Sequence, residues 1–260
     1  MEFSKIKALV LTHDANRPFA QSTVRAYDAL WPDHPFTFFI PFQQDDRAWG
    51  SNLQFVRSPK GILETMAALL EGVADEEMVY WSVDDRIPIN LNQSRLQQLM
   101  AQLEKSSRGP HPLMDGLCFT RAQAFTKKME PGVRTIEGSH FVRRLTYKGI
   151  WHHQVIRGKV LKNFWSQIQI ADTPRQMGAY ASRAVMPSDF RLFSTWSSPL
   201  IQAEQFRNGI PTAVAINLAY SRGVLLPEGT KRGTYSRADI FGKNSALFWL
   251  RELLRLWRSN

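Results

Sequence analysis

The sequence contains a single cysteine, Cys118, so the chain cannot form an internal disulfide. No group of cysteine and histidine residues has the spacing of a zinc site. Because the chain has neither a disulfide nor such a cluster, its cysteine content favours a reducing compartment, the cytoplasm. No stretch approaches the ~18 uninterrupted apolar residues of a membrane-spanning helix. The charged segment 1–7 leads straight into an apolar run, unlike a signal peptide. Internal repeats and low-complexity tracts are absent as well, so the sequence predicts a cytoplasmic globular protein without a membrane span.

The charge of the chain is unevenly distributed. The formal net charge is +10, yet residues 1–90 carry 8 of the 33 Lys and Arg residues and 13 of the 23 Asp and Glu residues. Residues 91–260 therefore carry 25 basic and 10 acidic residues. This basic part predicts an anionic partner, which could be a nucleotide diphosphate, a lipid phosphate, an anionic membrane surface or nucleic acid.

Apolar runs and segments of helical periodicity alternate along the first part of the chain. This alternation predicts an α/β fold with a mostly parallel sheet covered by helices. After Trp151, helical stretches are punctuated by prolines. We therefore expect a core in residues 1–155 and a mainly helical region in residues 156–260, which is either part of the same domain or an appendage. Strands are expected at 6–11, 36–40, 53–56, 79–83 and 116–120, and helices at 19–30, 61–70, 92–105 and 141–148.

The most informative segment is an apolar run, Val79–Val83, that ends in Asp84, Asp85 and Arg86. Carboxylates at the carboxyl end of a buried strand lie where open α/β sheets bind ligands. Two such acids can hold a hard cation such as Mg²⁺ or Mn²⁺, and the cation can bind a diphosphate. The alternative is a strand that ends in a solvated Asp-Asp turn, and these residues alone leave both interpretations open.

Four motifs, spread over residues 6–153, resemble those of the GT-A-fold nucleotide-sugar glycosyltransferases, especially the large inverting family 2-like group. Thr12–Pro18 is similar to the turn after that family's first strand, and Lys60-Gly61 to the start of the helix before its Asp-x-Asp motif. Gly116–Phe125 resembles a strand followed by Arg-Arg-x-x-Phe, and Glu137–Gly149 a Glu-Asp-x-x-Leu helix that ends in glycine.

The resemblance implies a GT-A-like, Rossmann-like sheet with a helical C-terminal extension. It also implies an inverting enzyme that moves a sugar from a nucleotide-sugar donor to a hydroxyl of a glycan or lipid-linked acceptor, in surface polysaccharide assembly. Such a reaction needs a carboxylate base and positive charge on the departing diphosphate.

The resemblance implies that Glu137 is the catalytic base, with Asp172 as the reserve candidate. The chain departs from the family at Gly138, where the family usually has its catalytic aspartate. An alternative role for Glu137 is a carboxylate that favourably interacts with the amino terminus of a helix.

Asp84 and Asp85 are the expected ligands of a divalent cation, Mn²⁺ or Mg²⁺, and the resemblance implies that His153 or His152 completes the site. A neutral imidazole is a plausible ligand, although a His-His pair is more often a packing feature. Arg86 stands where a second metal-binding aspartate could lie, so it could either repel a cation or bind phosphate itself.

Other polar residues are candidates for holding the nucleotide. Thr12, Asp14 and Arg17 follow the first strand and are expected at the ligand-binding edge of the sheet. Lys60 could reach a phosphate, although a single loop lysine is usually just a solvated charge.

The segment 244–258 has the pattern of a basic amphipathic helix with a tryptophan. It could bind an anionic membrane surface from the cytoplasmic side, or dock its apolar side on the domain. Two rival functions remain open: a basic nucleic-acid-binding protein, which no recognised motif supports, and a nucleotidyltransferase that uses the same acidic strand end.

Overall fold

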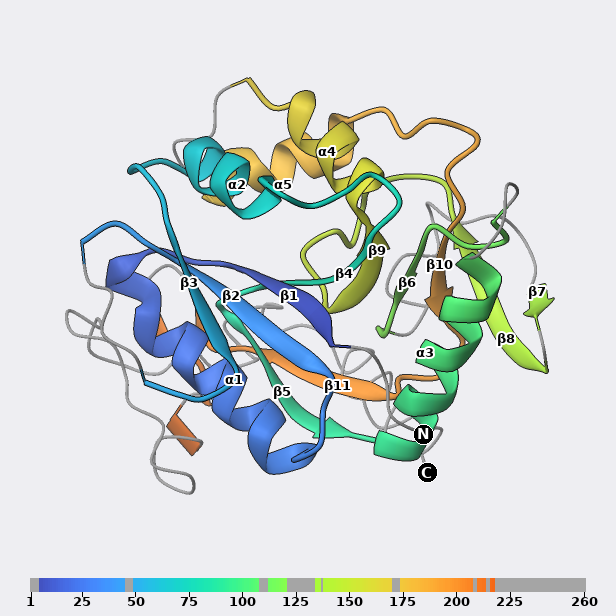
Figure 1. The fold of residues 1–260 in the computed structure, drawn as a ribbon, viewed down its shortest axis with the longest axis horizontal. Helices are drawn as coiled ribbons and strands as arrows, with labels where there is room; N and C mark the ends of the chain where they lie inside the picture. Colours follow the sequence, from blue (N-terminus) through green and yellow to red (C-terminus); the bar gives the residue numbers. More distant parts are fainter. Residues whose placement is uncertain are drawn as a thin grey trace, which may run out of the picture.

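A nine-stranded mixed sheet forms the centre of the computed structural model (Figure 1). The structure describes residues 5–44, 49–107, 112–120, 134–136, 138–169, 174–207, 210–213 and 216–217. The strands follow the order β3-β2-β1-β4-β9-β6-β10-β8-β7 across the sheet. Their bounds are β1 Ile6–Leu11, β2 Phe36–Phe42, β3 Leu53–Arg57, β4 Met78–Val83, β6 Gly116–Cys118, β7 Arg134–Ile136, β8 Ser139–Arg144, β9 Gln154–Arg157 and β10 Leu192–Thr195.

Most strands of this sheet run in one direction. β1 is parallel to β2 and β4, β3 is parallel to β2, and β6 is parallel to β10. β9 is antiparallel to its neighbours β4 and β6, and β8 is antiparallel to β10 and β7. Within this sheet, only β8 and β9 therefore run against the others, and the carboxyl ends of β1, β2, β3 and β4 lie at the same edge.

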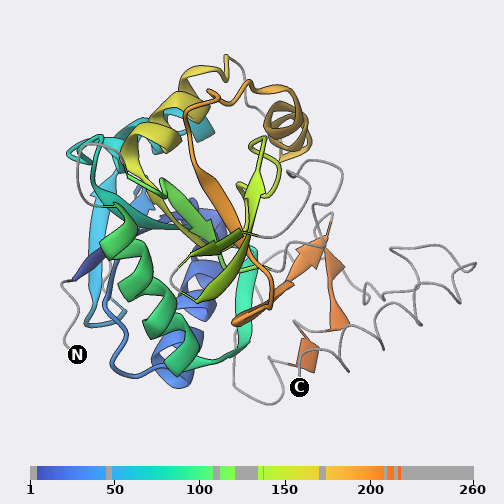
Figure 2. The same cartoon turned by 90° about the vertical axis from the view of Figure 1, so that its right-hand side faces the viewer.

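Helices cover both faces of the sheet because alternate strand residues point to opposite sides. Ala8 and Val10 of β1 pack in a core with α1 and α3, whereas Leu9 packs in a second core with α2 and α4. Figures 1 and 2 show α2, α4 and α5 together on one side of the sheet and α1 and α3 on the other. The helix bounds are α1 Arg17–Leu30, α2 Ile62–Leu70, α3 Gln93–Ser107, α4 Gly158–Ser166 and α5 Pro174–Arg183, and a short 3-10 helix, η1, spans Asp14–Asn16.

A small antiparallel sheet lies beyond the acidic end of β4. It pairs β5 (Arg86–Leu91) with β11 (Leu200–Glu204), and the register places Glu204 opposite Arg86. β12 (Phe206–Arg207) and β13 (Ile210–Pro211) form a separate hairpin away from the main sheet (Figure 2).

The predicted α/β class, with a mostly parallel sheet covered by helices, is confirmed. The helix predicted at 141–148 is wrong, because this segment forms β8 and the turn that follows it. β8 pairs on both sides, with β10 and β7, and these pairings override the local helical pattern. Gly149, predicted to end the helix, has φ +93° in the turn instead.

The predicted boundary at residue 155 falls inside β9 (Gln154–Arg157). β10, from the second predicted region, lies between β6 and β8 in the main sheet. The described part of residues 156–260 therefore contributes strand β10 to the same sheet, in addition to the helices α4 and α5. No helix among the described residues combines the length and the apolar character needed to cross a membrane.

Candidate functional site

The acidic end of β4 lies directly beside the end of β1. The two strands pair through Val10 with Ser82 and Leu11 with Val83, so the next residues on each strand also meet. The backbone N–H of Asp84 donates to the carbonyl of Leu11 at 3.1 Å. The Thr12 hydroxyl donates to Asp84 Oδ2 at 2.8 Å. Two of the residues predicted for the site, far apart in sequence, are therefore in contact at the carboxyl edge of the sheet.

Asp84 is an unusually buried carboxylate. Only 8% of its surface is exposed. Burial, with a further contribution from the neighbouring charge of Asp85, raises its pKa from 3.8 to about 7, although hydrogen bonds from Thr12 and Asn16 oppose this change. Near neutral pH the side chain therefore exchanges between its protonated and ionised forms.

Asp85 and Arg86 belong to a short row of charges. Arg86 Nε lies 3.7 Å from Asp85 Oδ1, and its Nη2 lies 4.0 Å from Glu204 Oε1. Burial raises the pKa of Asp85, Arg86 lowers it, and Glu204 raises it again. Arg86 thus lies between the carboxylates of Asp85 and Glu204 and offsets part of their repulsion.

Gln205 holds the turn between β4 and β5. Its backbone N–H donates to the carbonyl of Asp85 at 2.8 Å, and its side-chain Nε2 donates to the carbonyl of Asp84 at 3.3 Å. Gln205 is 1% exposed, so these two bonds are shielded from water. Neither Gln205 nor Glu204 was a candidate from the sequence, because their place beside the acids depends on the pairing of β11 with β5.

Asp14 connects the segment after β1 to the end of β2. Its carboxylate accepts the backbone N–H groups of Gln43 at 3.1 Å and Gln44 at 2.7 Å. Arg17 Nη2 lies 3.7 Å from Asp14, and its guanidinium lies over the Phe55 ring, 5.6 Å from the ring centroid. Both predicted residues therefore lie at the same sheet edge as Asp84, and Lys60 is exposed in the loop after β3.

His153 is fully buried behind the acidic turn. Its Nε2–H donates to the carbonyl of Arg86 at 2.8 Å, and its Nδ1 is hydrogen-bonded to the hydroxyls of Tyr27 and Tyr80. Burial, chiefly, lowers its pKa to about 3, so the imidazole is neutral. In this arrangement both ring nitrogens already have partners, and His153 supports the backbone of the turn.

His152, the other histidine of the pair, also has protein partners. Its Nδ1 lies within hydrogen-bond distance of the Thr120 hydroxyl, at 3.3 Å, and of the Gln202 amide. Across the described part of the chain, no group of three or more His, Cys, Asp and Glu side chains is arranged to hold a metal ion. Glu137, Asp172 and the segment 244–258 lie outside the described residues, so their predicted roles stay predictions.

Comparisons with known proteins find distant structural similarity to this chain and no family match. No model of a protein family matches it, and no curated protein sequence does either. Among solved structures, it is similar to the galactosyltransferase LgtC in complex with donor and acceptor sugar analogues, at 13% identity and a TM-score of 0.37, covering 84% of this chain and 79% of that one.

Two further solved structures are similar at the same level. One is TarS 1-349 of S. aureus in complex with UDP-GlcNAc, at 12% identity and a TM-score of 0.48, covering 78% of this chain and 59% of that one. The other is the cytidylyltransferase IspD of Francisella tularensis, at 9% identity and a TM-score of 0.42, covering 85% and 100%. These low values carry no conclusion on the reaction, and the closer assignment to the inverting family 2-like group stays a prediction.

Proposed function

We propose that this protein is a glycosyltransferase that binds a nucleotide-sugar donor at the carboxyl edge of β1 and β4. The observation that carries the proposal is the contact of buried Asp84 with Thr12 at this edge, next to Asp85. Ligands of open α/β sheets bind outside the carboxyl ends of the strands. A buried acid with a strongly raised pKa beside a second acid is also typical of functional sites.

The two acids fit a divalent cation because they offer only oxygen ligands. Mg²⁺ is usually held by one or two carboxylates together with phosphate oxygens of the substrate, so Asp84 and Asp85 would suffice on the protein side. When bound, the cation would supply positive charge to the diphosphate. Arg86 opposes such a cation only in part, since it lies between Asp85 and Glu204.

Other residues of the edge would orient the donor. Thr12 donates to Asp84 and so fixes the direction of the carboxylate. Asp14 fixes the backbone between the ends of β1 and β2, which places Arg17 near this edge. Lys60, exposed after β3, is the remaining candidate for a phosphate contact.

Glu137, with Asp172 in reserve, is proposed as the base that removes the proton of an acceptor hydroxyl, on the resemblance alone. The proposed acceptor class, a hydroxyl of a glycan or of a lipid-linked molecule, also rests on the resemblance alone. Glu137→Gln should abolish transfer and leave donor binding intact, because only the proton acceptor is lost. Unchanged turnover would remove Glu137 from the mechanism.

Donor binding is best tested by thermal unfolding with UDP-, GDP-, CMP- and dTDP-sugars, each with and without Mn²⁺. A ligand that binds only the folded protein raises the melting temperature. We expect one nucleotide class to stabilise the wild type more with Mn²⁺ than without, and Asp84→Asn to lose that difference. Asp33→Asn, at an exposed acid outside the edge, is the matched control.

If no sugar nucleotide stabilises the protein at millimolar concentration, the proposal is wrong. Product analysis separates sugar transfer from the rival nucleotide transfer, because the first releases a nucleoside diphosphate, or CMP from a CMP-sugar, and the second releases pyrophosphate. Association of residues 244–258 with a membrane also stays a proposal. Flotation with anionic vesicles, with and without residues 244–260, tests it.

A further inference from the structure

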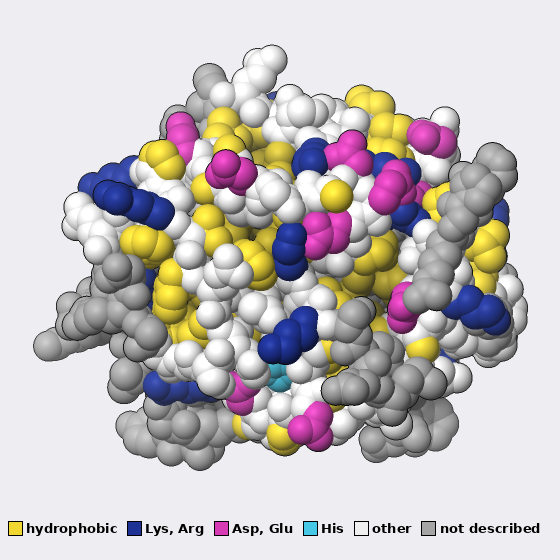
Figure 3. Space-filling model, viewed as in Figure 1, with side chains coloured by type: hydrophobic (Ala, Val, Ile, Leu, Met, Phe, Trp, Pro, Cys, Tyr) yellow, Lys and Arg dark blue, Asp and Glu magenta, His cyan; other side chains and the backbone are white. Residues whose placement is uncertain are grey.

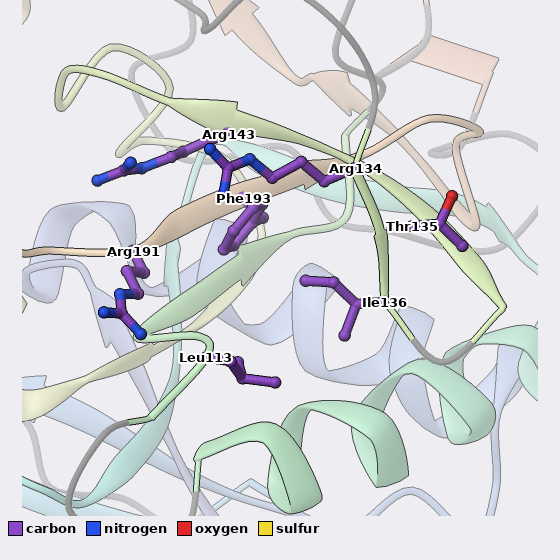
Figure 4. A pocket seen from close by; sticks show the side chains of 7 residues that line it. All are labelled: Leu113, Arg134, Thr135, Ile136, Arg143, Arg191 and Phe193. Atoms are coloured by element: carbon purple, nitrogen blue, oxygen red, sulfur yellow. The ribbon is translucent and has the colours of Figure 1, made fainter.

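A pocket lies on a different part of the sheet from the acidic edge, between β7, β8, β10 and the segment before β6 (Figure 4). Its volume is about 640 Å³. β10 is separated from β4 by β9 and β6, and three strand spacings amount to roughly 14 Å. The described residues that line the pocket are Leu113, Arg134, Thr135, Ile136, Arg143, Arg191 and Phe193, none of which belongs to the acidic edge.

The register of the strands explains why three arginines share this pocket. Arg143 of β8 pairs directly with Phe193 of β10, so their side chains lie on the same face of the sheet. Arg191 precedes Phe193 by two residues and therefore points to that face as well. Arg134 enters from the neighbouring strand β7, and Figure 4 shows the three arginines on one side of the pocket.

Among the described residues, no acid forms an ion pair with Arg143 or Arg191. Arg143 donates to the carbonyl of Ser188 at 2.8 Å, and Arg191 donates to the carbonyl of Pro112 at 2.7 Å. These carbonyls are neutral, and the lining contains no carboxylate among the residues that the structure describes. Arg143 Nη2 also donates to the carbonyl of Phe190 at 3.5 Å, so its guanidinium is held in place by neutral groups.

The other side of the pocket is apolar. Leu113 and Ile136 lie opposite the arginines, and the ring of Phe193 lies between these two parts (Figure 4). Leu113 is 54% exposed, so its side chain adds apolar surface to the mouth of the pocket. The pocket thus combines positive charge with apolar surface, and its volume lies within the range of about 300–1,000 Å³ that is typical of small-molecule sites.

We propose that this pocket binds a phosphate group carried on an apolar body. The guanidinium groups of Arg143 and Arg191 would hold the phosphate oxygens through the N–H groups that do not donate to the carbonyls of Ser188 and Pro112. The apolar body would cover Leu113, Ile136 and Phe193. This proposal is independent of the donor site proposed above, so either proposal can be wrong while the other is right.

The test is isothermal titration calorimetry of the full chain with two probes that share the phosphate. Dihexanoyl phosphatidic acid, below its critical micelle concentration, carries short acyl chains, and glycerol 3-phosphate does not. We expect the lipid phosphate to bind more tightly. Arg143→Gln and Arg191→Gln should each weaken its binding about tenfold or more, the loss typical of a charged hydrogen bond.

Controls separate binding from folding. Arg143→Lys keeps the charge but loses the planar fork, so we expect an intermediate affinity. Arg183→Gln, an exposed arginine of α5 outside the pocket, should bind like the wild type. Each variant should keep the wild-type circular dichroism spectrum and its response to sugar nucleotides, which shows that the fold and the other site are intact.

The outcomes are distinct. Equal binding of both probes, lost in Arg143→Gln and Arg191→Gln, would keep the phosphate site and overturn the apolar part of the proposal. Absence of binding by both probes would overturn the proposal as a whole, as would binding that the Arg143 and Arg191 variants leave unchanged.

Discussion

The buried carboxylate of Asp84 should make the stability of the metal-free protein depend on pH in a way that Asp84→Asn removes. Its pKa is 3.8 when exposed to water and about 7 in the folded protein. Between these values the folded protein holds a proton that the unfolded chain releases, so stability falls as the pH rises. The complete difference of about 3 pH units corresponds to about 4 kcal/mol, at about 1.4 kcal/mol for each unit.

Part of this change is accessible under mild conditions. Between pH 5 and pH 7.5, the wild type should lose about 2.5 kcal/mol through this group alone. Asn is isosteric and its carbonyl oxygen can still accept from Thr12, but it does not ionise. The free energy of unfolding of Asp84→Asn, measured relative to that of the wild type, should therefore rise by about 2.5 kcal/mol between pH 5 and pH 7.5.

Urea unfolding of both proteins in the presence of a chelator measures this difference. Other titrating groups, His153 included, are present in both proteins and cancel in the comparison. Asp33→Asn, at an exposed carboxylate, should leave the change from pH 5 to pH 7.5 as it is in the wild type. If Asp84→Asn differs from the wild type by the same free energy at both pH values, the carboxylate is not buried as described, and the argument for the site fails with it.

Three further substitutions test the surroundings of the site and the core, each by urea unfolding. His153→Ala should cost about 3 kcal/mol, because it leaves buried groups unpaired. In the wild type, the pKa of His153 is lowered to about 3, so below pH 6.5 the unfolded chain binds a proton that the folded protein does not, and stability falls with pH. The variant lacks this group and should therefore lose less stability as the pH falls below 6.5. Arg157→Met should cost about 3 kcal/mol, because it leaves buried Asp115, 3.0 Å away, without its main partner. Gly158→Ala should cost about 2 kcal/mol, because the new Cβ would lie 2.2 Å from the carbonyl oxygen of Ala74.

The first half of the sheet was predictable because each of its strands has a clear local pattern. β1 and β4 are short apolar runs bounded by polar residues, and both form as expected. Once two such strands are parallel neighbours, the residues after them must meet at one edge, which brings Thr12 to Asp84. The core of the candidate site therefore follows from sequence order and the geometry of parallel strands.

The second half was less predictable because non-local pairing decides it. Residues 141–144 form part of strand β8 because they pair with β10 on one side and β8 pairs with β7 on the other. β5, which begins at Arg86, was not expected, and its partner β11 lies more than a hundred residues later in the chain. Since Glu204 and Gln205 reach the acidic turn only through this pairing, no local pattern could have assigned them to the site.

Three residues from other parts of the chain hold the turn that carries Asp84, and their bonds indicate whether Asp84 has a structural or a binding role. Thr12 contacts the carboxylate, Gln205 holds the carbonyls of Asp84 and Asp85, and His153 holds the carbonyl of Arg86. The bonds of Gln205 and His153 go to backbone carbonyls and do not need a carboxylate at position 84, and at neutral pH an asparagine there would avoid the cost of burying a charge. The carboxylate of Asp84 is therefore better explained by what its charge can bind than by packing, and the proposed cation should bind there more tightly as the pH rises through about 7.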